Sequence, residues 1–200
     1  MQQGIFTKGM RLENARVLLR ELTEQDVQHL VTFSLNEPEN WTYGLENAAG
    51  EENLRAYIAN ALDGKRSGQS YPFIIFDKHT QTFAGSTRYY QINPKHKRLA
   101  IGYTWLGNKY KRTGLNIHIK YLMLEYAFEI LHMERVEFMA DVMNENSILS
   151  ILALGATKEG IMRSHAEKPD GHRRDTAVFS ILKKEWLEHV KPSLLQKISI

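Results

Sequence analysis

The stretch that decides the fold runs from Tyr110 to Leu131 and reads YKRTGLNIHIKYLMLEYAFEIL. Two cationic residues, a hydroxyl and a glycine stand directly before a long run of helix-compatible apolar residues. A helix that begins here has free backbone N–H groups and the positive end of its dipole at Gly114, where the missing side chain lets an anion approach. The stretch is equally consistent with a solvated basic loop before a core helix, and the flanking segments decide between the two.

The helix expected after Gly114 is apolar enough to lie near the centre of the molecule. Leu124, Phe128 and Leu131 fill much of one side. The opposite side keeps the 3.6-residue spacing of a buried face, with Leu115, Ile119, Leu122, Met123, Tyr126, Ala127 and Ile130. Such a helix is typical of one packed centrally on a sheet.

Strands are predicted on both sides of this helix. The segments Tyr71 to Phe76, Thr82 to Ile92 and Arg98 to Leu106 are joined by the short turns DKHTQ and NPKHK, which predicts an antiparallel meander. Arg135 to Val142 is a further strand. Because a strand, a helix and a strand then follow one another between residues 98 and 142, a parallel crossover is expected inside a mostly antiparallel sheet.

The remaining segments complete an α+β pattern. We expect one mixed, mostly antiparallel sheet of about six or seven strands with about four helices. The further expected strands are Ala15 to Leu22, Thr157 to Arg163 and Arg174 to Leu182. The further expected helices run from Thr23 to about Leu35, from Glu51 to Lys65, and from Asn144 to Ala156, where Gly155 ends the helix.

Length and composition predict one soluble domain. Two hundred residues with 42% hydrophobic content suit a single domain over residues 1–200, with residues 1–10 and 190–200 as peripheral tails. The amino terminus lacks the apolar core of a signal peptide, and no segment approaches the ~18 consecutive apolar residues of a membrane span. We therefore expect a cytoplasmic protein without a membrane partner.

Charge and residue usage restrict the class of ligand. The formal net charge is only +3 and the basic residues are scattered, so nucleic acid is not signalled as a partner, whereas a small polyanion fits. The chain has no cysteine, which excludes disulfides, thiolate metal sites and a cysteine nucleophile. No metal site is predicted, and any catalysis must use other groups.

Four local signals follow one another along the chain: GSTRYYQI, IGYTWL, the KRTGLN loop, and NENSILSILALGA continuing into KEGIMRSHAEKPDGHRRD. Together and in this order they resemble the GNAT acetyltransferases, specifically the branch of the Rim-type ribosomal-protein N-terminal acetyltransferases. The resemblance covers most of the chain, from VLLREL to DTAVFSILKKEW. It implies the GNAT-like fold, with a splayed central pair of strands.

The resemblance also implies a cofactor. In the family, a loop of the form (Gln/Arg)-x-x-Gly-x-(Gly/Ala) binds the pyrophosphate of acetyl-CoA, and Lys111, Gly114 and Asn116 occupy its three key places here. Asn116 departs from the pattern because a smaller residue is usual, although its amide could itself donate to a phosphate oxygen. The expected cofactor-binding residues of the loop are Lys111, Arg112, Thr113, Gly114, Leu115 and Asn116.

Further contacts follow from the same resemblance. The strand ending at Thr104, Trp105 and Leu106 would splay from Ala140 to Val142 and pair with the pantetheine, while ordinary pairing with Trp105 in the core is the alternative. Asn144 and Ser147 match the family's Asn-x-x-Ser, with Asn144 touching the cofactor and Ser147 donating a proton near the sulfur. Asn144 is equally a natural N-cap.

The sequence signals for residues that contact the amine acceptor are less specific. Glu167 stands where some Rim-type enzymes carry a carboxylate that takes the amine proton, and an exposed loop glutamate is the alternative. His165 carries an imidazole, a group suited to proton transfer, but is one of eight histidines. Trp41 and Tyr43 lie in a turn-rich loop that could line a ligand mouth. Arg88 and Tyr89 alternate on a strand, where core packing and substrate lining are both open.

These residues predict an acetyl-CoA-dependent N-acetyltransferase that moves an acetyl group to a primary amine by direct transfer in a ternary complex. The alternatives are a catalytically silent GNAT-like module that binds acyl-CoA or a protein, and a basic RNA-associated protein. The acceptor is left open between a protein or peptide N-terminus and a polyamine or antibiotic amine. A homodimer contact is one role for the apolar tail with Leu194, Leu195 and Ile198.

Overall fold

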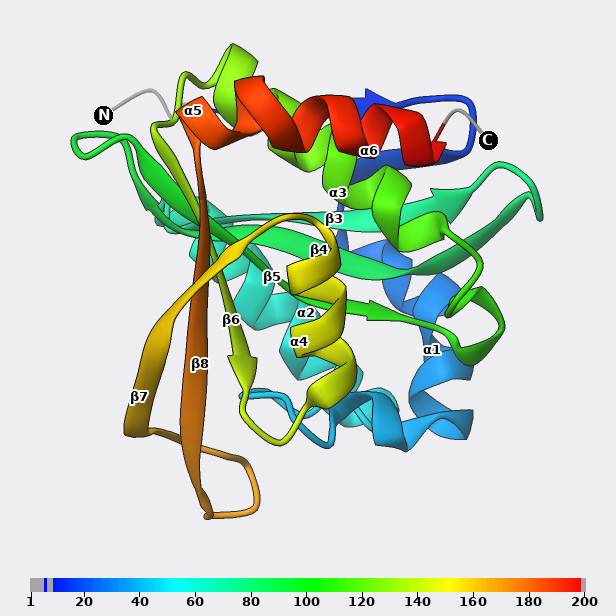
Figure 1. Cartoon of the computed structure of the whole chain (residues 1–200). Helices are drawn as coiled ribbons and strands as arrows, with labels where there is room; N and C mark the ends of the chain where they lie inside the picture. The colour runs from blue at the N-terminus through cyan, green and yellow to red at the C-terminus, as the bar shows by residue number, and fades with distance from the viewer. Residues whose placement is uncertain (1–5, 7–8, 199–200) are drawn as a thin grey trace.

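A computed structural model describes Phe6 and residues 9–198 of the chain, and Figure 1 shows its arrangement. Its centre is one mixed eight-stranded sheet in the order β1-β2-β3-β4-β5-β6-β8-β7. The strands are β1 (Arg11–Glu13), β2 (Val17–Glu21), β3 (Ser70–Asp77), β4 (Thr82–Asn93), β5 (Arg98–Leu106), β6 (Arg135–Asp141), β7 (Thr157–Glu167) and β8 (Arg173–Leu182).

The topology matches the sequence prediction in its central part. Strands β3, β4 and β5 form the expected antiparallel meander, and β5 pairs with β6 in parallel across the predicted crossover. The sheet has one strand more than expected, because β1 pairs with β2 over only three residues, too short for a recognisable alternation. The α+β class and the GNAT-like arrangement are confirmed.

Helices cover both faces of the sheet (Figure 1). On one face lies α3 (Leu115–Glu125), which continues as a π-helical turn over Tyr126–Ile130, together with α4 (Glu145–Ala153). On the opposite face lie α1 (Val27–Asn36), which follows a short 3-10 turn over Glu24–Asp26, and α2 (Glu51–Arg66). A further 3-10 turn, Pro38–Trp41, begins the segment between α1 and α2.

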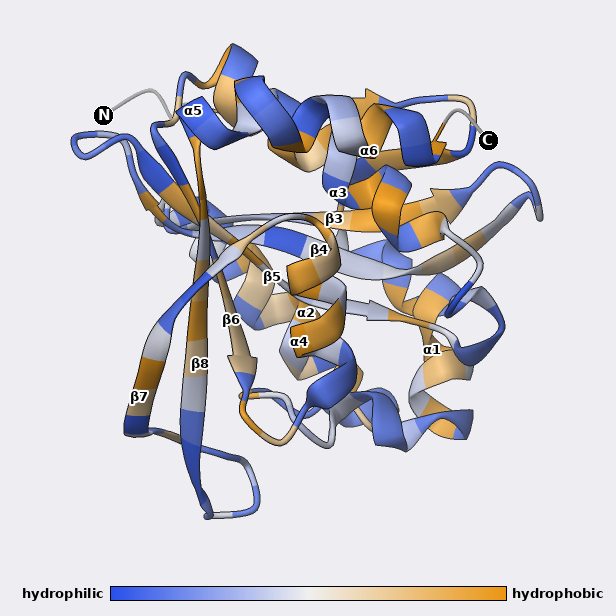
Figure 2. Cartoon of the chain, in the orientation of Figure 1, coloured by the Kyte–Doolittle hydropathy of each residue, from blue (hydrophilic) through white to orange (hydrophobic). Residues whose placement is uncertain are grey.

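Two apolar cores result from this layering, and Figure 2 shows the hydropathy of each residue along the strands and helices that form them. The larger core holds the inner face of α3, where Leu115, Ile119 and Met123 are wholly buried. A second core lies between α1, α2 and the other face of the sheet, around Leu54 and Trp105. Most of the predicted buried face of the central helix is in the larger core, whereas Ile130 at its end is 61% exposed.

The carboxyl-terminal segment corrects one expectation. Residues 190–200 were expected to be a peripheral tail, yet α6 (Lys191–Ile198) packs on α3. It follows α5 (Lys183–Glu185) and the π-helical turn Trp186–Val190. Leu194 is wholly buried in the larger core and Ile198 packs against it. Both residues therefore pack within their own chain, where a contact with a second subunit was considered. Of the expected amino-terminal tail, residues 1–5 and 7–8 lie outside the described residues, as do 199–200.

Within the described residues, every helix is too short or too polar to cross a membrane. The same residues contain no cluster of histidine, aspartate and glutamate that could hold a metal ion.

Candidate active site

The sheet opens between β5 and β6. These strands pair only where Arg98, Leu99 and Ala100 lie opposite Arg135, Val136 and Glu137, and Figure 1 shows them diverging beyond that point. Tyr103 adopts a positive φ of 50°, and the pairing of β5 with β4 is irregular between Ser86 and Arg88. The splayed strand pair expected from the sequence is confirmed, and it leaves the β6-facing edge of β5 available to an extended ligand.

The loop before α3 is shaped to accept an anion. Gly114 is the N-cap residue of α3 in the left-handed conformation, with φ 84°, and a Cβ placed there would meet no atom within 4 Å. Arg112 also has a positive φ, 60°, and both residues are exposed. A helix N-terminus with open space in front of it and an adjacent guanidinium favours a phosphate.

Other residues of this loop contribute differently. Lys111 does not reach over the helix end, because its Nζ donates to Asn40 Oδ1 at 2.5 Å and to Asn108 Oδ1 at 2.7 Å. Thr113 Oγ1 donates to the carbonyl of Tyr110 at 2.7 Å, which closes the turn. Leu115 is wholly buried in the larger core and anchors the start of α3.

A buried arginine lies on the α2 face of the sheet beside the split. The Arg88 guanidinium carbon is 4.7 Å from the ring centre of Tyr57 and 3.9 Å from that of Tyr103, and Nη1 lies 3.3 Å from Glu46 Oε1. Burial alone would lower the pKa of Arg88, but the Tyr57 and Glu46 groups outweigh it and keep the pKa above its ordinary value. Glu46 Oε2 is buried without a hydrogen-bond partner.

A second arginine, which the sequence reading did not single out, ties β8 to the loop between α1 and α2. Arg174 Nη1 donates to the carbonyl oxygen of Tyr43 at 3.2 Å, and its Nε donates to Thr176 Oγ1 at 3.0 Å. His165 Nδ1 lies 3.0 Å from the same Thr176 hydroxyl. The structure thereby joins Tyr43 and His165 into one polar network beyond the split.

Two of the predicted substrate residues belong to the cores instead. Tyr89 is wholly buried on the α3 face and donates its hydroxyl to the Met123 carbonyl at 2.6 Å, because it alternates with Arg88 along β4. Trp41 is only 7% exposed and packs edge-on against Trp105, with ring centres 5.2 Å apart. Trp41 therefore supports the strand that borders the split and does not form an open mouth.

The start of α4 is organised by Asn144. Its Oδ1 accepts the backbone N–H of Ser147 at 3.0 Å, which is the N-cap role considered as the alternative to cofactor contact. Ser147 is half-buried in the first turn of α4. Since α4 follows β6 directly, this turn lies at the β6 side of the opening.

Glu167 lies farther out. It ends β7 and pairs with Arg173, whereas Asp141 at the end of β6 lies opposite Thr176 of β8. The side chain is exposed on the part of the β7–β8 hairpin that extends past the end of β6. No contact between the Glu167 side chain and the split supports its assignment as the general base within the described residues. His165, in contrast, joins the network of Thr176 and Arg174.

Lys120 is a functional candidate that sequence reasoning missed. It lies in α3, is only 6% exposed, and donates from Nζ to Thr104 Oγ1 of β5 at 2.5 Å. Burial lowers its pKa to about 7. The sequence feature that could have indicated it is a single lysine within the mostly apolar segment LNIHIKYLML. Counting apolar positions along the helix does not detect such a residue.

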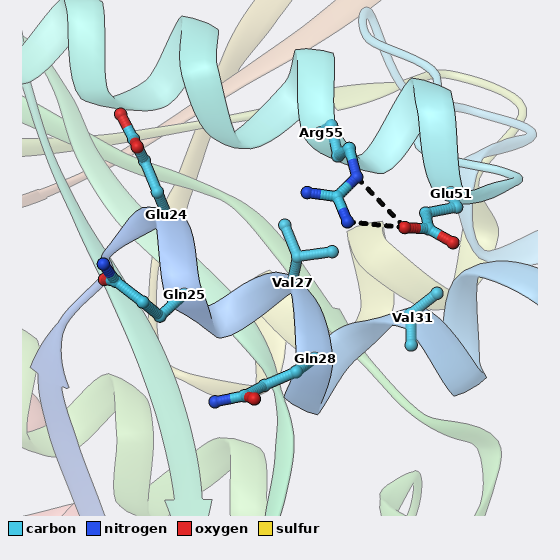
Figure 3. Close-up of a pocket in the computed structure, with 7 residues that line it drawn as sticks. All are labelled: Glu24, Gln25, Val27, Gln28, Val31, Glu51 and Arg55. Atoms are coloured by element: carbon cyan, nitrogen blue, oxygen red, sulfur yellow. Dashed lines mark hydrogen bonds and ion pairs between the residues drawn. The ribbon is translucent and has the colours of Figure 1, made fainter.

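One open hollow lies away from this region, on the outer side of α1 and α2 (Figure 3). Its volume is about 380 Å³, and Arg55 on its wall pairs with Glu51 one turn earlier in α2. The lining residues are Glu24, Gln25, Val27, Gln28, Val31, Glu51 and Arg55. None of them touches the split or the loop before α3, so we do not assign the chemistry to this hollow.

The geometry can be compared with known proteins. The sequence pattern of the Acetyltransferase (GNAT) domain family matches residues 16–157. The chain is 27% identical over 172 residues to the uncharacterized N-acetyltransferase YoaA of Bacillus subtilis (strain 168), covering 86% of this chain and 96% of YoaA. It is 24% identical over 183 residues to YdaF of the same strain, a candidate ribosomal N-acetyltransferase, covering 86% and 94%.

A solved structure agrees with these relatives. A candidate acetyltransferase from T. thermophilus is 31% identical, superimposes with a TM-score of 0.87, and is matched over 96% of this chain and 99% of its own. The similarity therefore includes the segments after residue 157, which contain β7, β8 and α6.

Proposed function

Because the chain belongs to the GNAT family of acetyltransferases, we propose that it binds acetyl-CoA at the split between β5 and β6 and transfers the acetyl group directly to a primary amine. The observation that carries the proposal is that two features lie next to each other along the chain. The unpaired edge of β5 ends at Leu106, and the loop that follows leads into the open anion site at Gly114. An elongated ligand with a phosphate at one end fits both.

The proposed path of the donor follows from this arrangement. The pyrophosphate lies at the start of α3, where Arg112 and the free N–H groups offset its charge. The pantetheine runs along β5 beside Trp105 and Leu106. The main-chain groups of β5 beyond Ala100 have no β6 partner within the described residues. A main-chain N–H of this edge then donates to the acetyl oxygen, which gains negative charge in the transition state.

The amine is proposed to approach from the α2 face, where Arg88, Glu46, Arg174 and His165 gather. It attacks the thioester carbonyl as a neutral amine, the carbon–sulfur bond breaks, and the thiolate takes a proton. We propose Ser147 as the donor of that proton. The proton lost by the amine passes to Glu167 or His165, or to water. Both side chains are exposed, and the contact of His165 with the Thr176 hydroxyl favours His165.

Ser147 can be tested by substitution. Ser147→Ala is expected to lower turnover several-fold while leaving acetyl-CoA affinity near the parent value, because a proton donor to the leaving thiolate acts on the transition state. Ser150→Ala, an exposed serine on the same helix, is the matched control. Unchanged turnover, measured when chemistry limits the rate, would leave Ser147 with its place in the first turn of α4 and no catalytic part.

The function itself is tested by thioester consumption against a panel of amines. The panel should hold peptides with free N-termini, polyamines and aminoglycosides, each beside its N-blocked analogue. YdaF, named as a ribosomal N-acetyltransferase, supports the inclusion of ribosomal-protein N-terminal peptides. We expect CoA release with at least one free amine and none with its blocked form. Binding of CoA without consumption by any amine would instead support a silent acyl-CoA-binding module.

A further inference from the structure

Lys120 is a cation held out of water without a carboxylate beside it. The residue is 6% exposed, and its Nζ donates to the hydroxyl of Thr104 at 2.5 Å. No salt bridge of Lys120 exists among residues 6 and 9–198. A buried ammonium is costly unless it is paired or well hydrogen-bonded, so this position is unfavourable for the fold alone.

The place that Lys120 reaches is the split itself. Thr104 lies on β5 beyond Ala100, the last residue that pairs with β6. The positive φ of Tyr103 shifts the alternation of side chains, so that Thr104 faces α3 and not α2. Thr104 Oγ1 also lies 2.7 Å from Thr87 Oγ1, so the hydroxyls under Lys120 form a short polar row.

Asn116 gives a second, independent observation. It precedes Lys120 by one turn of α3, so the two side chains lie on the same side of the helix. Its Oδ1 is buried and has no hydrogen-bond partner. On the opposite side, His118 contacts Asn14, between β1 and β2. The Asn116–Lys120 side of α3 is consequently the side turned toward β5 and β6.

We infer that Lys120 and Asn116 bind the amide-containing arm of the acyl donor, with Lys120 Nζ donating to a carbonyl oxygen and Asn116 Oδ1 accepting an amide N–H. An amide chain offers the acceptor that Lys120 lacks and the donor that Asn116 lacks. The inference rests on the proposed function, and it goes beyond it by adding side-chain recognition from α3 to main-chain pairing along β5. Both residues act as binding residues for the donor.

The test compares two ligands that share the nucleotide but differ in the arm. Coenzyme A carries the pantetheine, while adenosine 3′,5′-bisphosphate reaches only the anion site at Gly114. Calorimetric titration of Lys120→Met with each is the central experiment. Loss of a hydrogen bond to a charged group should weaken coenzyme A binding about tenfold and leave the bisphosphate within about twofold of the parent.

Matched variants make the result specific. Lys184→Met removes the same charge from a side chain that is 82% exposed on α5, and it should change neither affinity. Lys120→Gln keeps a donor and should retain more coenzyme A affinity than Lys120→Met. Equal weakening for both ligands, no weakening for a folded Lys120→Met protein, or lower coenzyme A affinity for Lys120→Gln than for Lys120→Met would overturn the inference. Failure of the parent protein to bind coenzyme A would overturn the proposed function as well.

Discussion

Two cations are buried on opposite faces of the central sheet, and their surroundings differ. Arg88, on the α2 face, has the Glu46 carboxylate and the rings of Tyr57 and Tyr103 around its guanidinium. Lys120, on the α3 face, has the hydroxyl of Thr104 as its hydrogen-bond partner and no ion pair within the described residues. Burial lowers the pKa of Lys120 to about 7, whereas the partners of Arg88 outweigh burial and keep its pKa raised.

The difference separates a cation that has a carboxylate beside it from one whose partner is a neutral hydroxyl. Even so, Nε and Nη2 of Arg88 are buried without a hydrogen-bond partner among the described residues. Arg88 fixes the α1–α2 loop to the sheet through Glu46, so removing it should damage the fold. Burial without a charged partner is expected to make Lys120 cost stability, which is typical of residues that serve binding or catalysis. The comparison therefore predicts opposite signs for the same type of substitution.

The largest effect is expected for Arg88→Met. Removing one partner of a buried ion pair costs ~3–5 kcal/mol, because the remaining charge loses its partner in a poorly solvated place. Since the Glu46 side chain is 22% exposed, we expect about 3 kcal/mol less unfolding free energy in denaturant titrations at pH 7. Arg66→Met, which breaks the exposed pair with Asp63, should stay within ~0.5 kcal/mol. A loss below ~1 kcal/mol for Arg88→Met would remove the contrast with Lys120.

Lys120→Met should change stability in the other direction. Methionine has a similar length without the charge, so it avoids the desolvation of a group whose pKa falls from its ordinary value to about 7. We expect a gain on the order of 2 kcal/mol at pH 7, measured in the same titrations. A destabilised Lys120→Met protein would mean that Lys120 has a structural partner that outweighs its burial.

The pH dependence of stability sharpens the same point. Between pH 7 and about 9 the unfolded chain keeps the Lys120 proton while the folded chain loses it, because burial has lowered the folded-state pKa to about 7. The unfolded state therefore binds more protons, and the unfolding free energy should rise with pH by about 1 kcal/mol per pH unit from this group. Lys120→Met should lack this part of the slope. Parallel profiles for the two proteins would refute the lowered pKa.

Much of the fold could be predicted because its signals are local. The turns DKHTQ and NPKHK defined the meander, and the apolar spacing after Gly114 defined the central helix. Strand β1 was missed because three residues carry no periodicity. The segment around Leu194 was taken for a tail because its apolar residues are too few to indicate a partner, and only the packing on α3 reveals one.

The candidate site likewise has parts that could be predicted from the sequence and parts that could not. The start of the central helix was predictable because Gly114 directly precedes the apolar run in the sequence, and Gly114 is the N-cap residue of α3. Arg174, Glu46 and Lys120 were missed because their roles depend on contacts between distant segments, such as Arg174 with Tyr43. Tyr89 was misplaced because alternation along β4 fixes two faces without saying which one meets the ligand.

The most direct test of the proposed donor site is a calorimetric titration of coenzyme A into Gly114→Val beside Gly68→Val. Both glycines have a left-handed φ, 84° and 74°, and both face open space, so the two substitutions impose similar backbone strain. Only the side chain at residue 114 would stand in front of the first turn of α3. We expect Gly114→Val to lose at least tenfold in affinity while Gly68→Val binds like the parent protein. Equal affinity in both variants would contradict the assignment of the donor phosphates to the start of α3.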